Sequence, residues 1–190
     1  MFNRHSTKHG HNDHFPLLQK HLVHGVYDIM AAGPTAPTKD DIKAFEKKWD
    51  ITLPRDFVSF SVSQISGIYV NVKEEYWPPS KEYDVRPFWA FCSGLYVFSF
   101  SDDAPDFMNI EKKMAEFREE TDQVFVPCLS IVSNADFFGF TADGKVGQWI
   151  HDEGIIEKTD RSFLDLLDHE LGELAKRQAQ MEGDKEKYSK

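Results

Sequence analysis

The chain has 190 residues and a mass of 22.0 kDa, which suits one domain. Its 41% hydrophobic and 14% aromatic content can fill a large core and excludes global disorder. The formal net charge of −10 arises entirely after residue 72 and disfavours direct binding to nucleic acid. No apolar signal core or membrane-length run is present, so a cytoplasmic location is expected.

Residues 1–15 are expected to form a flexible leader rich in histidine, with His5, His9, His11 and His14. Imidazoles of this kind can bind zinc or nickel. However, no cysteine or carboxylate accompanies them at a fixed spacing. We therefore expect a solvated leader without a functional metal site.

The first helix is predicted between Pro16 and Ala31. Leu18, Leu22, Val26 and Ile29 recur there at helical spacing.

Two further helices are predicted on either side of a short extended loop. Thr38 and Asp41 have nearly the spacing of a capping box and open a helix that ends around Asp50. Pro54 suits the first position of the next helix, because its missing N–H costs nothing there. Gly67 is a plausible end for that helix.

The hydrophobic period changes from helical to alternating at Ile68. Strands are predicted within residues 68–77, 83–91, 94–100, 124–132, 136–140 and 145–151. The Asp143-Gly144 pair predicts a tight turn between the last two strands.

Two more helices complete the prediction, one from Phe107 to Glu120 and one that opens near Thr159. Beyond Ala175 the chain becomes polar and is expected to fray. The fold class is therefore α+β: a mostly antiparallel twisted sheet flanked by N-terminal helices and a C-terminal helix. One domain is expected over residues 16–175, followed by a polar tail over 176–190.

Acidic and imidazole side chains are the candidates for catalysis. His151, Asp152 and Glu153 form the best acidic–imidazole cluster, which could act as a general base or bind a divalent ion beside Asp136 and Asp143. A solvated hairpin end explains the same residues. The motifs of zinc proteases, P-loop proteins, serine hydrolases and dinucleotide-binding domains are missing from the sequence. We therefore expect no enzyme, no cofactor and no bound metal.

The two cysteines, Cys92 and Cys128, lie in apolar, strand-like surroundings. Buried free thiols are expected rather than a disulfide.

A protein-binding surface has more support than a catalytic site. Aromatic anchors and a charged field are typical of interfaces. Carboxylates cluster at Asp102, Asp103 and Asp106, at Glu116, Glu119, Glu120 and Asp122, and at Asp152 and Glu153. Aromatic residues near expected loops are Tyr76, Trp77, Tyr83, Phe88 and Trp89. The alternative is that these charges are ordinary solvated faces and that the aromatic residues belong to the core.

The order of segments resembles the SUKH superfamily, which contains the fungal Knr/Smi cell-wall regulators and many bacterial immunity proteins. The matching residues of the N-terminal signature are Phe45, Glu46, Ile51, Leu53, Pro54, Asp56, Phe57 and Phe60. The segment "FVPCLSIVSNADFFGFTADGKVGQWIHDE" and the closing "RSFLDLL" resemble later parts of the family pattern. Asp50 and Ser66-Gly67 depart from it, and residues 76–91 match nothing in it.

This resemblance implies a non-enzymatic binding domain, and bacterial members commonly neutralise a toxin, often a nuclease. We expect a basic cognate toxin as partner, with no binding to nucleic acid or membrane. The hypothetical partner-binding face comprises Trp77, Asp102, Asp103, Asp106, His151 and Asp152. The motif residues Phe45, Glu46, Leu53, Pro54, Asp56 and Phe57 are expected to be structural. The alternatives are an intracellular scaffold or regulatory module, and a hydrolase or metal-dependent enzyme centred on His151 and Asp152.

Overall fold

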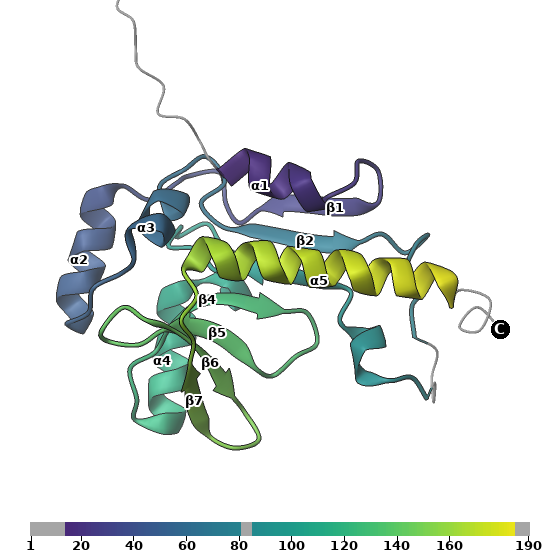
Figure 1. The fold of residues 1–190 in the computed structure, drawn as a ribbon. Coiled ribbons are helices and arrows are strands. Elements are labelled where there is room, and N and C mark those ends of the chain that lie inside the picture. Colours follow the sequence, from purple (N-terminus) through teal and green to yellow (C-terminus); the bar gives the residue numbers. More distant parts are fainter. Residues whose placement is uncertain (1–13, 81–84, 185–190) are drawn as a thin grey trace, which may run out of the picture.

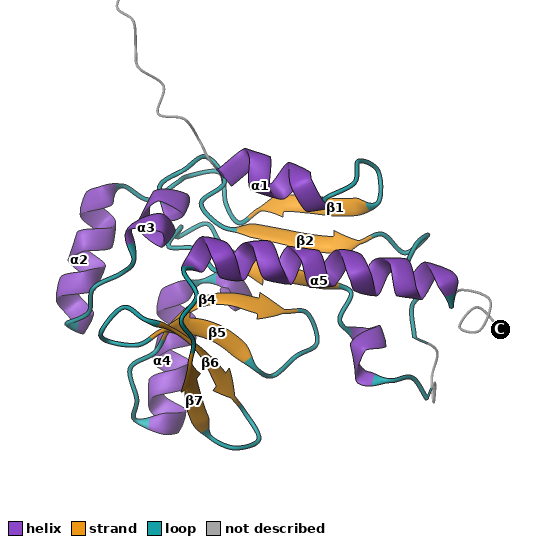
Figure 2. Cartoon of the chain, in the orientation of Figure 1, coloured by secondary structure: helices purple, strands orange, loops and turns teal. Residues whose placement is uncertain are grey.

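The computed structural model describes residues 14–80 and 85–184, which form one α+β unit (Figures 1 and 2). The helices are α1 (His14–His21), α2 (Lys39–Trp49), α3 (Arg55–Ser61), α4 (Ile110–Thr121) and α5 (Phe163–Gly183), with short 3-10 turns η1 (Phe88–Phe91) and η2 (Asp106–Met108). The strands are β1 (Tyr27–Ala31), β2 (Ile68–Val72), β3 (Gly94–Val97), β4 (Val126–Ile131), β5 (Phe137–Phe140), β6 (Val146–Ile150) and β7 (Ile155–Lys158).

The seven strands form one sheet in which spatial order follows chain order from β1 to β7. Every neighbouring pair is antiparallel. This confirms the predicted fold class. The β5–β6 hairpin contains the predicted turn, where Gly144 has a φ of 74° and its N–H donates to the carbonyl of Thr141. A residue with a Cβ is strained at that φ, so glycine suits the position.

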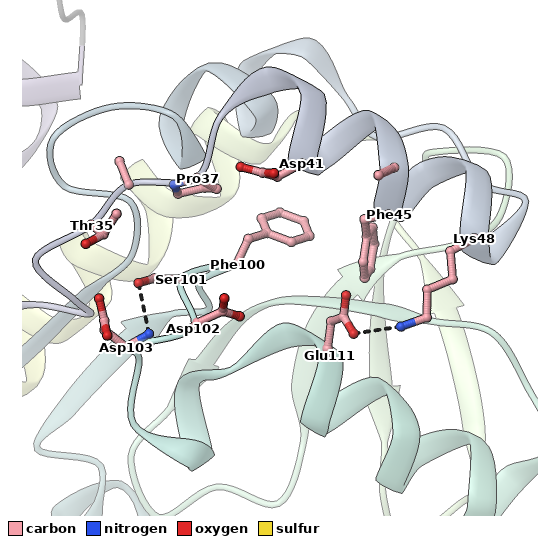
Figure 3. A pocket seen from close by; sticks show the side chains of 12 residues that line it. Thr35, Pro37, Asp41, Phe45, Lys48, Phe100, Ser101, Asp102, Asp103 and Glu111 are labelled. Atoms are coloured by element: carbon pink, nitrogen blue, oxygen red, sulfur yellow. Dashed lines mark hydrogen bonds and ion pairs between the residues drawn. The ribbon is translucent and has the colours of Figure 1, made fainter.

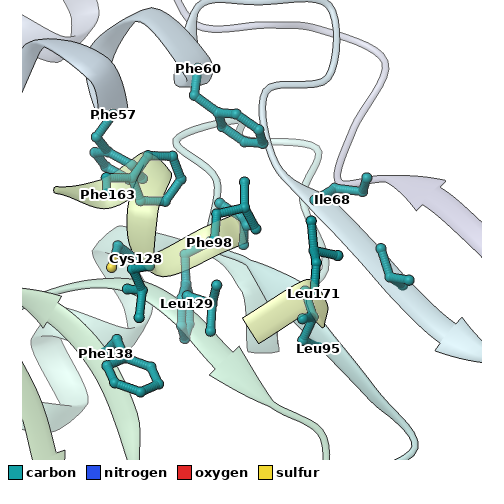
Figure 4. Packing of buried hydrophobic residues seen from close by; sticks show 14 of the residues in the cluster. Phe57, Phe60, Ile68, Leu95, Phe98, Cys128, Leu129, Phe138, Phe163 and Leu171 are labelled. Atoms are coloured by element: carbon teal, nitrogen blue, oxygen red, sulfur yellow. The ribbon is translucent and has the colours of Figure 1, made fainter. Parts of the chain in front are cut away.

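Both faces of the sheet are covered. Helix α5 crosses one face (Figure 1), and its Phe163 and Leu171 pack with Leu95 and Leu129 of the sheet (Figure 4). On the opposite face, Phe117 of α4 packs with a smaller group of aromatic residues. These are Phe125, Phe137 and Trp149. The main core therefore lies between the sheet and α5, together with α1–α3.

Phe57 of the family signature is at the centre of the aromatic core. Its side chain is fully buried, and its ring centroid lies 4.8 Å from that of Phe140 and 4.9 Å from that of Phe163. A third neighbour, Phe100, lies 6.1 Å away and links this cluster to Phe45 of α2. Phe57 thus connects α3, α5 and the sheet.

Two carboxylates of the same signature fix the backbone. Glu46 Oε1 accepts the Leu53 N–H at 2.7 Å, which holds the α2–α3 loop against α2. Asp56 Oδ1 accepts the N–H of Phe57 at 2.9 Å, and its Oδ2 accepts the N–H of Leu164 at 3.2 Å. Asp56 therefore binds the first turns of both α3 and α5, where N–H groups lack intrahelical partners.

Pro54 precedes α3 by one residue. Its dihedral angles of −60° and 141° make it the N-cap rather than the first helical residue that the sequence predicted. Leu53 beside it is 5% exposed. The capping box predicted for α2 is present, since Thr38 and Asp41 each accept the other's backbone N–H.

The helix predicted from Pro16 to Ala31 is wrong beyond His21. Helix α1 ends there, and Tyr27–Ala31 is strand β1, paired with β2. Gly25, with a φ of 89°, lies in the turn between them. The apolar spacing was compatible with a helix, but pairing with β2 satisfies the backbone instead.

The strand predicted over 83–91 is also wrong within the described residues. Pro87 precedes a 3-10 turn, η1, and residues 83 and 84 lie outside the described chain. Proline has no N–H to donate to a strand ladder, which disfavours a strand through this segment.

The C-terminal part contains two elements that differ from the prediction. Strand β7 was not predicted; it follows a turn at Gly154 and pairs with β6. The expected fraying after Ala175 is wrong, because α5 continues to Gly183 and Met181 is fully buried. Burial of Met181 gives the last turns of α5 a tertiary anchor. Cys92 and Cys128 are buried free thiols, as expected.

Candidate functional site

A cleft of about 530 Å³ lies between α2 and the segment that leads from β3 into α4 (Figure 3). Its lining residues are Thr35, Ala36, Pro37, Asp41, Ala44, Phe45, Lys48, Phe100, Ser101, Asp102, Asp103 and Glu111. We call it the acidic cleft, because four carboxylates and one ammonium group line it.

Asp102 and Asp103 lie on a well-fixed loop. The Ser99 hydroxyl accepts the Ser101 N–H at 3.0 Å, and the Ser101 hydroxyl accepts the Asp103 N–H at 3.3 Å. A parallel bridge between Ser99 and Asn109 closes the base of the same loop. Both aspartates are exposed, and neither carboxylate forms an ion pair or hydrogen bond with another described residue. Their charges are therefore available to a partner.

The other charged groups of the cleft already have partners. Lys48 Nζ of α2 lies 2.7 Å from Glu111 Oε2 of α4 and joins the two walls. Asp41 belongs to the α2 capping box, and hydrogen bonds from the side chain and backbone of Thr38 lower its pKa. Asp41 therefore stays ionised at neutral pH and adds to the negative potential.

The acidic cleft also has aromatic walls. The rings of Phe45 and Phe100 meet edge to face with centroids 4.8 Å apart, and Figure 3 shows both between Asp41 on one side and Asp102 and Glu111 on the other. Carboxylates beside an aromatic surface attract a cationic side chain, because the charge is neutralised while its aliphatic part finds apolar contact.

The structure divides the predicted face between several places. Asp102 and Asp103 line the acidic cleft, whereas Asp106 starts η2 and pairs with Lys112 at 2.6 Å. His151 and Asp152 lie in the β6–β7 turn and are exposed. His151 lines a separate groove of about 250 Å³ beside α4. The predicted face is therefore not gathered around one cavity: Asp102 and Asp103 line the acidic cleft, and His151 lines the groove beside α4.

Trp77 does not lie on the surface as the hypothesis required. Its side chain is 6% exposed, its Nε1–H donates to the carbonyl of Ala90 at 3.0 Å, and its ring packs against Trp89. An indole whose N–H is satisfied inside the protein is a core residue. The loop context of Trp77 in the sequence gave no sign of this partner.

Among the charged and aromatic residues of the cleft, five were not predicted for partner binding: Asp41, Phe45, Lys48, Phe100 and Glu111. Phe45 was expected to be structural. Asp41, Phe45 and Lys48 share one face of α2 at helical spacing. Phe100 and Glu111 lie far along the chain, after β3 and in α4, so no local spacing joins the two walls of the cleft. The available signal was the run Phe100–Asp103, where an aromatic residue and a serine precede two adjacent carboxylates.

Two carboxylates considered as metal ligands, Asp136 and Asp143, already have partners in the fold. The backbone N–H of His151 donates to Asp136 Oδ1 at 2.8 Å. The Asp143 carboxylate accepts from the Thr141 hydroxyl and lies near the Lys158 ammonium group. Those hydrogen-bonding and charge contacts lower the pKa of Asp143. These two carboxylates therefore fix turns rather than converge on an imidazole.

The two thiols are poorly suited to nucleophilic attack. Burial raises the pKa of both Cys92 and Cys128, so each stays protonated at neutral pH. In the described part of the chain, no three His, Cys, Asp or Glu side chains are grouped so as to hold a metal ion. His5, His9 and His11 lie outside the described residues. Among the helices described over 14–80 and 85–184, none has the length and apolar content needed to cross a membrane.

Comparison with known proteins identifies one family. The family model SUKH_6, described as SMI1-KNR4 cell-wall, matches residues 39–167, which extend from α2 into α5. The matched region includes the acidic cleft apart from its Thr35–Pro37 rim. No match was found among curated proteins.

Proposed function

Because the chain belongs to the SMI1-KNR4 (SUKH) family of generally non-enzymatic, protein-binding immunity and regulatory domains, we propose that it is a cytoplasmic immunity protein that neutralises a cognate toxin. The toxin is a basic protein, and nucleases are the class that fits best. A nuclease needs a basic groove for its phosphate substrate, and a field of carboxylates can occupy such a groove.

One observation carries the proposal: Asp102 and Asp103 present two carboxylates, free of partners among the described residues, at the mouth of a cleft with aromatic walls. The loop that bears them is held by Ser99 and Ser101, so little conformational entropy is lost when a partner binds. A lysine or arginine of the toxin can enter between α2 and this loop. Contact with Phe100, which is half-buried, then adds apolar area to the charge pairing.

Asp106, His151 and Asp152 belong to a wider contact area in this proposal. Asp106 follows the cleft residues Asp102 and Asp103 closely in the sequence, but its carboxylate is already paired with Lys112. Its contribution to toxin binding is therefore smaller. His151 and Asp152 lie at the β6–β7 turn. They would contact the toxin only if it also covers the groove beside α4. Trp77 is a buried core residue and is not part of the proposed contact area.

The test is co-expression with any toxin-like open reading frame that adjoins the gene. The wild-type chain should restore growth, and Asp102→Lys/Asp103→Lys should abolish the rescue and weaken the purified complex by about 100-fold or more. The matched control is Glu157→Lys/Asp160→Lys, which makes the same charge change at exposed positions at the β7 end of the sheet. The control should retain rescue.

Equal rescue by both double variants would remove the acidic cleft from the interface. Absence of rescue by the wild-type chain, together with stable capture of a non-toxin cellular partner through Asp102 and Asp103, would favour the regulatory alternative.

A further inference from the structure

A second surface of opposite charge lies on the other flank of α2. Here α2, the loop after it and α3 enclose a groove of about 450 Å³, which we call the cationic groove. Its lining residues are Lys39, Ile42, Lys43, Glu46, Leu53, Arg55, Val58, Ser59 and Val62. Lys48 and the carboxylates of the acidic cleft are not among them.

The floor of the cationic groove is apolar. Ile42 and Leu53 are 1% and 5% exposed, while Val58 and Val62 are half-buried at its edge. Val58 and Val62 lie four residues apart and so share one face of α3 and its C-cap. The groove therefore offers a strip of aliphatic contact between two helices.

The rim is basic in a chain that is strongly acidic overall. Three cations, Lys39, Lys43 and Arg55, line the groove with one carboxylate, Glu46. The carboxylate is engaged, because it accepts the Leu53 N–H at 2.7 Å. Among the described residues, Lys39 and Arg55 form no ion pair, and Lys43 has only the exposed neighbour Asp40 at 3.2 Å. An exposed pair of that kind is weak.

We propose that the cationic groove binds an acidic amphipathic helix of a partner protein. Leucine-like side chains of that helix would contact Val58 and Val62, above the buried Ile42, and its carboxylates would face Lys39 and Arg55. Two packed helices commonly accept a third helix along the groove between them. Helix α2 has 11 residues and so spans roughly 16 Å, enough for about three turns of a docked helix.

Charge complementarity selects this occupant over the chain's own ends. Residues 1–13 and 185–190 each contain more lysine and arginine than aspartate and glutamate, so the rim would repel them. It would equally repel the basic toxin proposed for the acidic cleft. The cationic groove therefore serves a different binding partner or a different, acidic segment of the same partner.

The test uses a synthetic amphipathic peptide of about 14 residues, with leucines at helical spacing and glutamates elsewhere. Methyl NMR spectra of the full chain are recorded during titration. The signals of Ile42, Val58 and Val62 should shift saturably. A peptide with lysine in place of every glutamate should leave them unchanged. Raising NaCl from about 50 mM to about 500 mM should weaken binding of the acidic peptide.

Charge reversal tests the rim. Lys39→Glu/Arg55→Glu should raise the dissociation constant at least about tenfold, and both changes place acid in a first helical turn, where folding tolerates it. Lys47→Glu/Lys145→Glu is the matched control, with exposed lysines outside the groove, and should change binding less than about threefold. Equal binding of both peptides, shifts confined to other methyl groups, or equal effects of the two double variants would each overturn the proposal.

Discussion

Glu46 should be a stability residue, although it is charged and only half-buried. Its carboxylate accepts the N–H of Leu53, a residue that is 5% exposed, at 2.7 Å. Glu46→Ala removes the acceptor and leaves that N–H without its partner. Hydrogen bonds to a charged group contribute about 1.5–3 kcal/mol, so we expect a loss of about 2 kcal/mol in the free energy of unfolding. In a chain of this size that corresponds to a fall of about 4–8 °C in Tm.

Urea unfolding followed by tryptophan fluorescence measures this loss. Glu46→Gln is the informative comparison, because its side-chain carbonyl can still accept the Leu53 N–H, and it should lose less than about 1 kcal/mol. Lys47→Ala is the control on the same helix, with an exposed side chain. The reasoning is refuted if Glu46→Ala and Lys47→Ala agree within about 0.5 kcal/mol, since the Glu46–Leu53 bond would then contribute nothing measurable.

Three further predictions follow from the core and from α5. Phe57→Ala should cost about 3–5 kcal/mol in urea unfolding, because the ring is fully buried, whereas Phe107→Ala, at a ring 51% exposed, should cost under about 1 kcal/mol. Burial raises the pKa of Glu170, so ionisation of its carboxyl group disfavours the folded state. The stability that Glu170→Gln gains over the wild type should therefore grow as pH rises from about 4 to about 7. A difference between variant and wild type that stays constant with pH would contradict this. Hydrogen bonds from Lys20 and from the His21 imidazole lower the pKa of Asp168. Its charge therefore contributes stability above the unfolded pKa that is lost as pH falls through the folded pKa. Asp168→Asn should flatten the acid limb of the curve of stability against pH, and an unchanged limb would exclude these contacts as its cause.

The elements that the sequence predicted well are those whose signals are local. The capping box of α2 needs only Thr38 and Asp41, and the β5–β6 turn needs only Gly144 with its neighbours. Each of these interactions closes within a few residues, so spacing alone reveals it. The wrong elements depended on distant partners instead. Tyr27–Ala31 is a strand because β2 lies beside it, and the end of α5 stays helical because Met181 is buried.

The candidate site was predicted in part for the same reason. Asp102 and Asp103 stood out as adjacent carboxylates, but the opposite wall comes from α2, which contributes Asp41 and Lys48, and Glu111 of α4 pairs with that wall through Lys48. Their proximity depends on how α2 packs over the sheet, which no spacing in the sequence encodes. Trp77 was misplaced because burial of an indole depends on an acceptor provided from elsewhere in the chain.

Helix α2 gives the protein two surfaces that can be separated by mutation. Lys39 and Lys43 are four residues apart and share one flank, while Asp41 and Lys48 belong to the other. Opposite charges on the two flanks mean that no single basic or acidic segment can occupy both. If two partners, or two segments that bind independently, use these surfaces, charge reversals in the cleft and in the groove should have additive effects on binding free energy. A single rigid partner that spans α2 would instead couple them, because loss of one contact would weaken the positioning of the other.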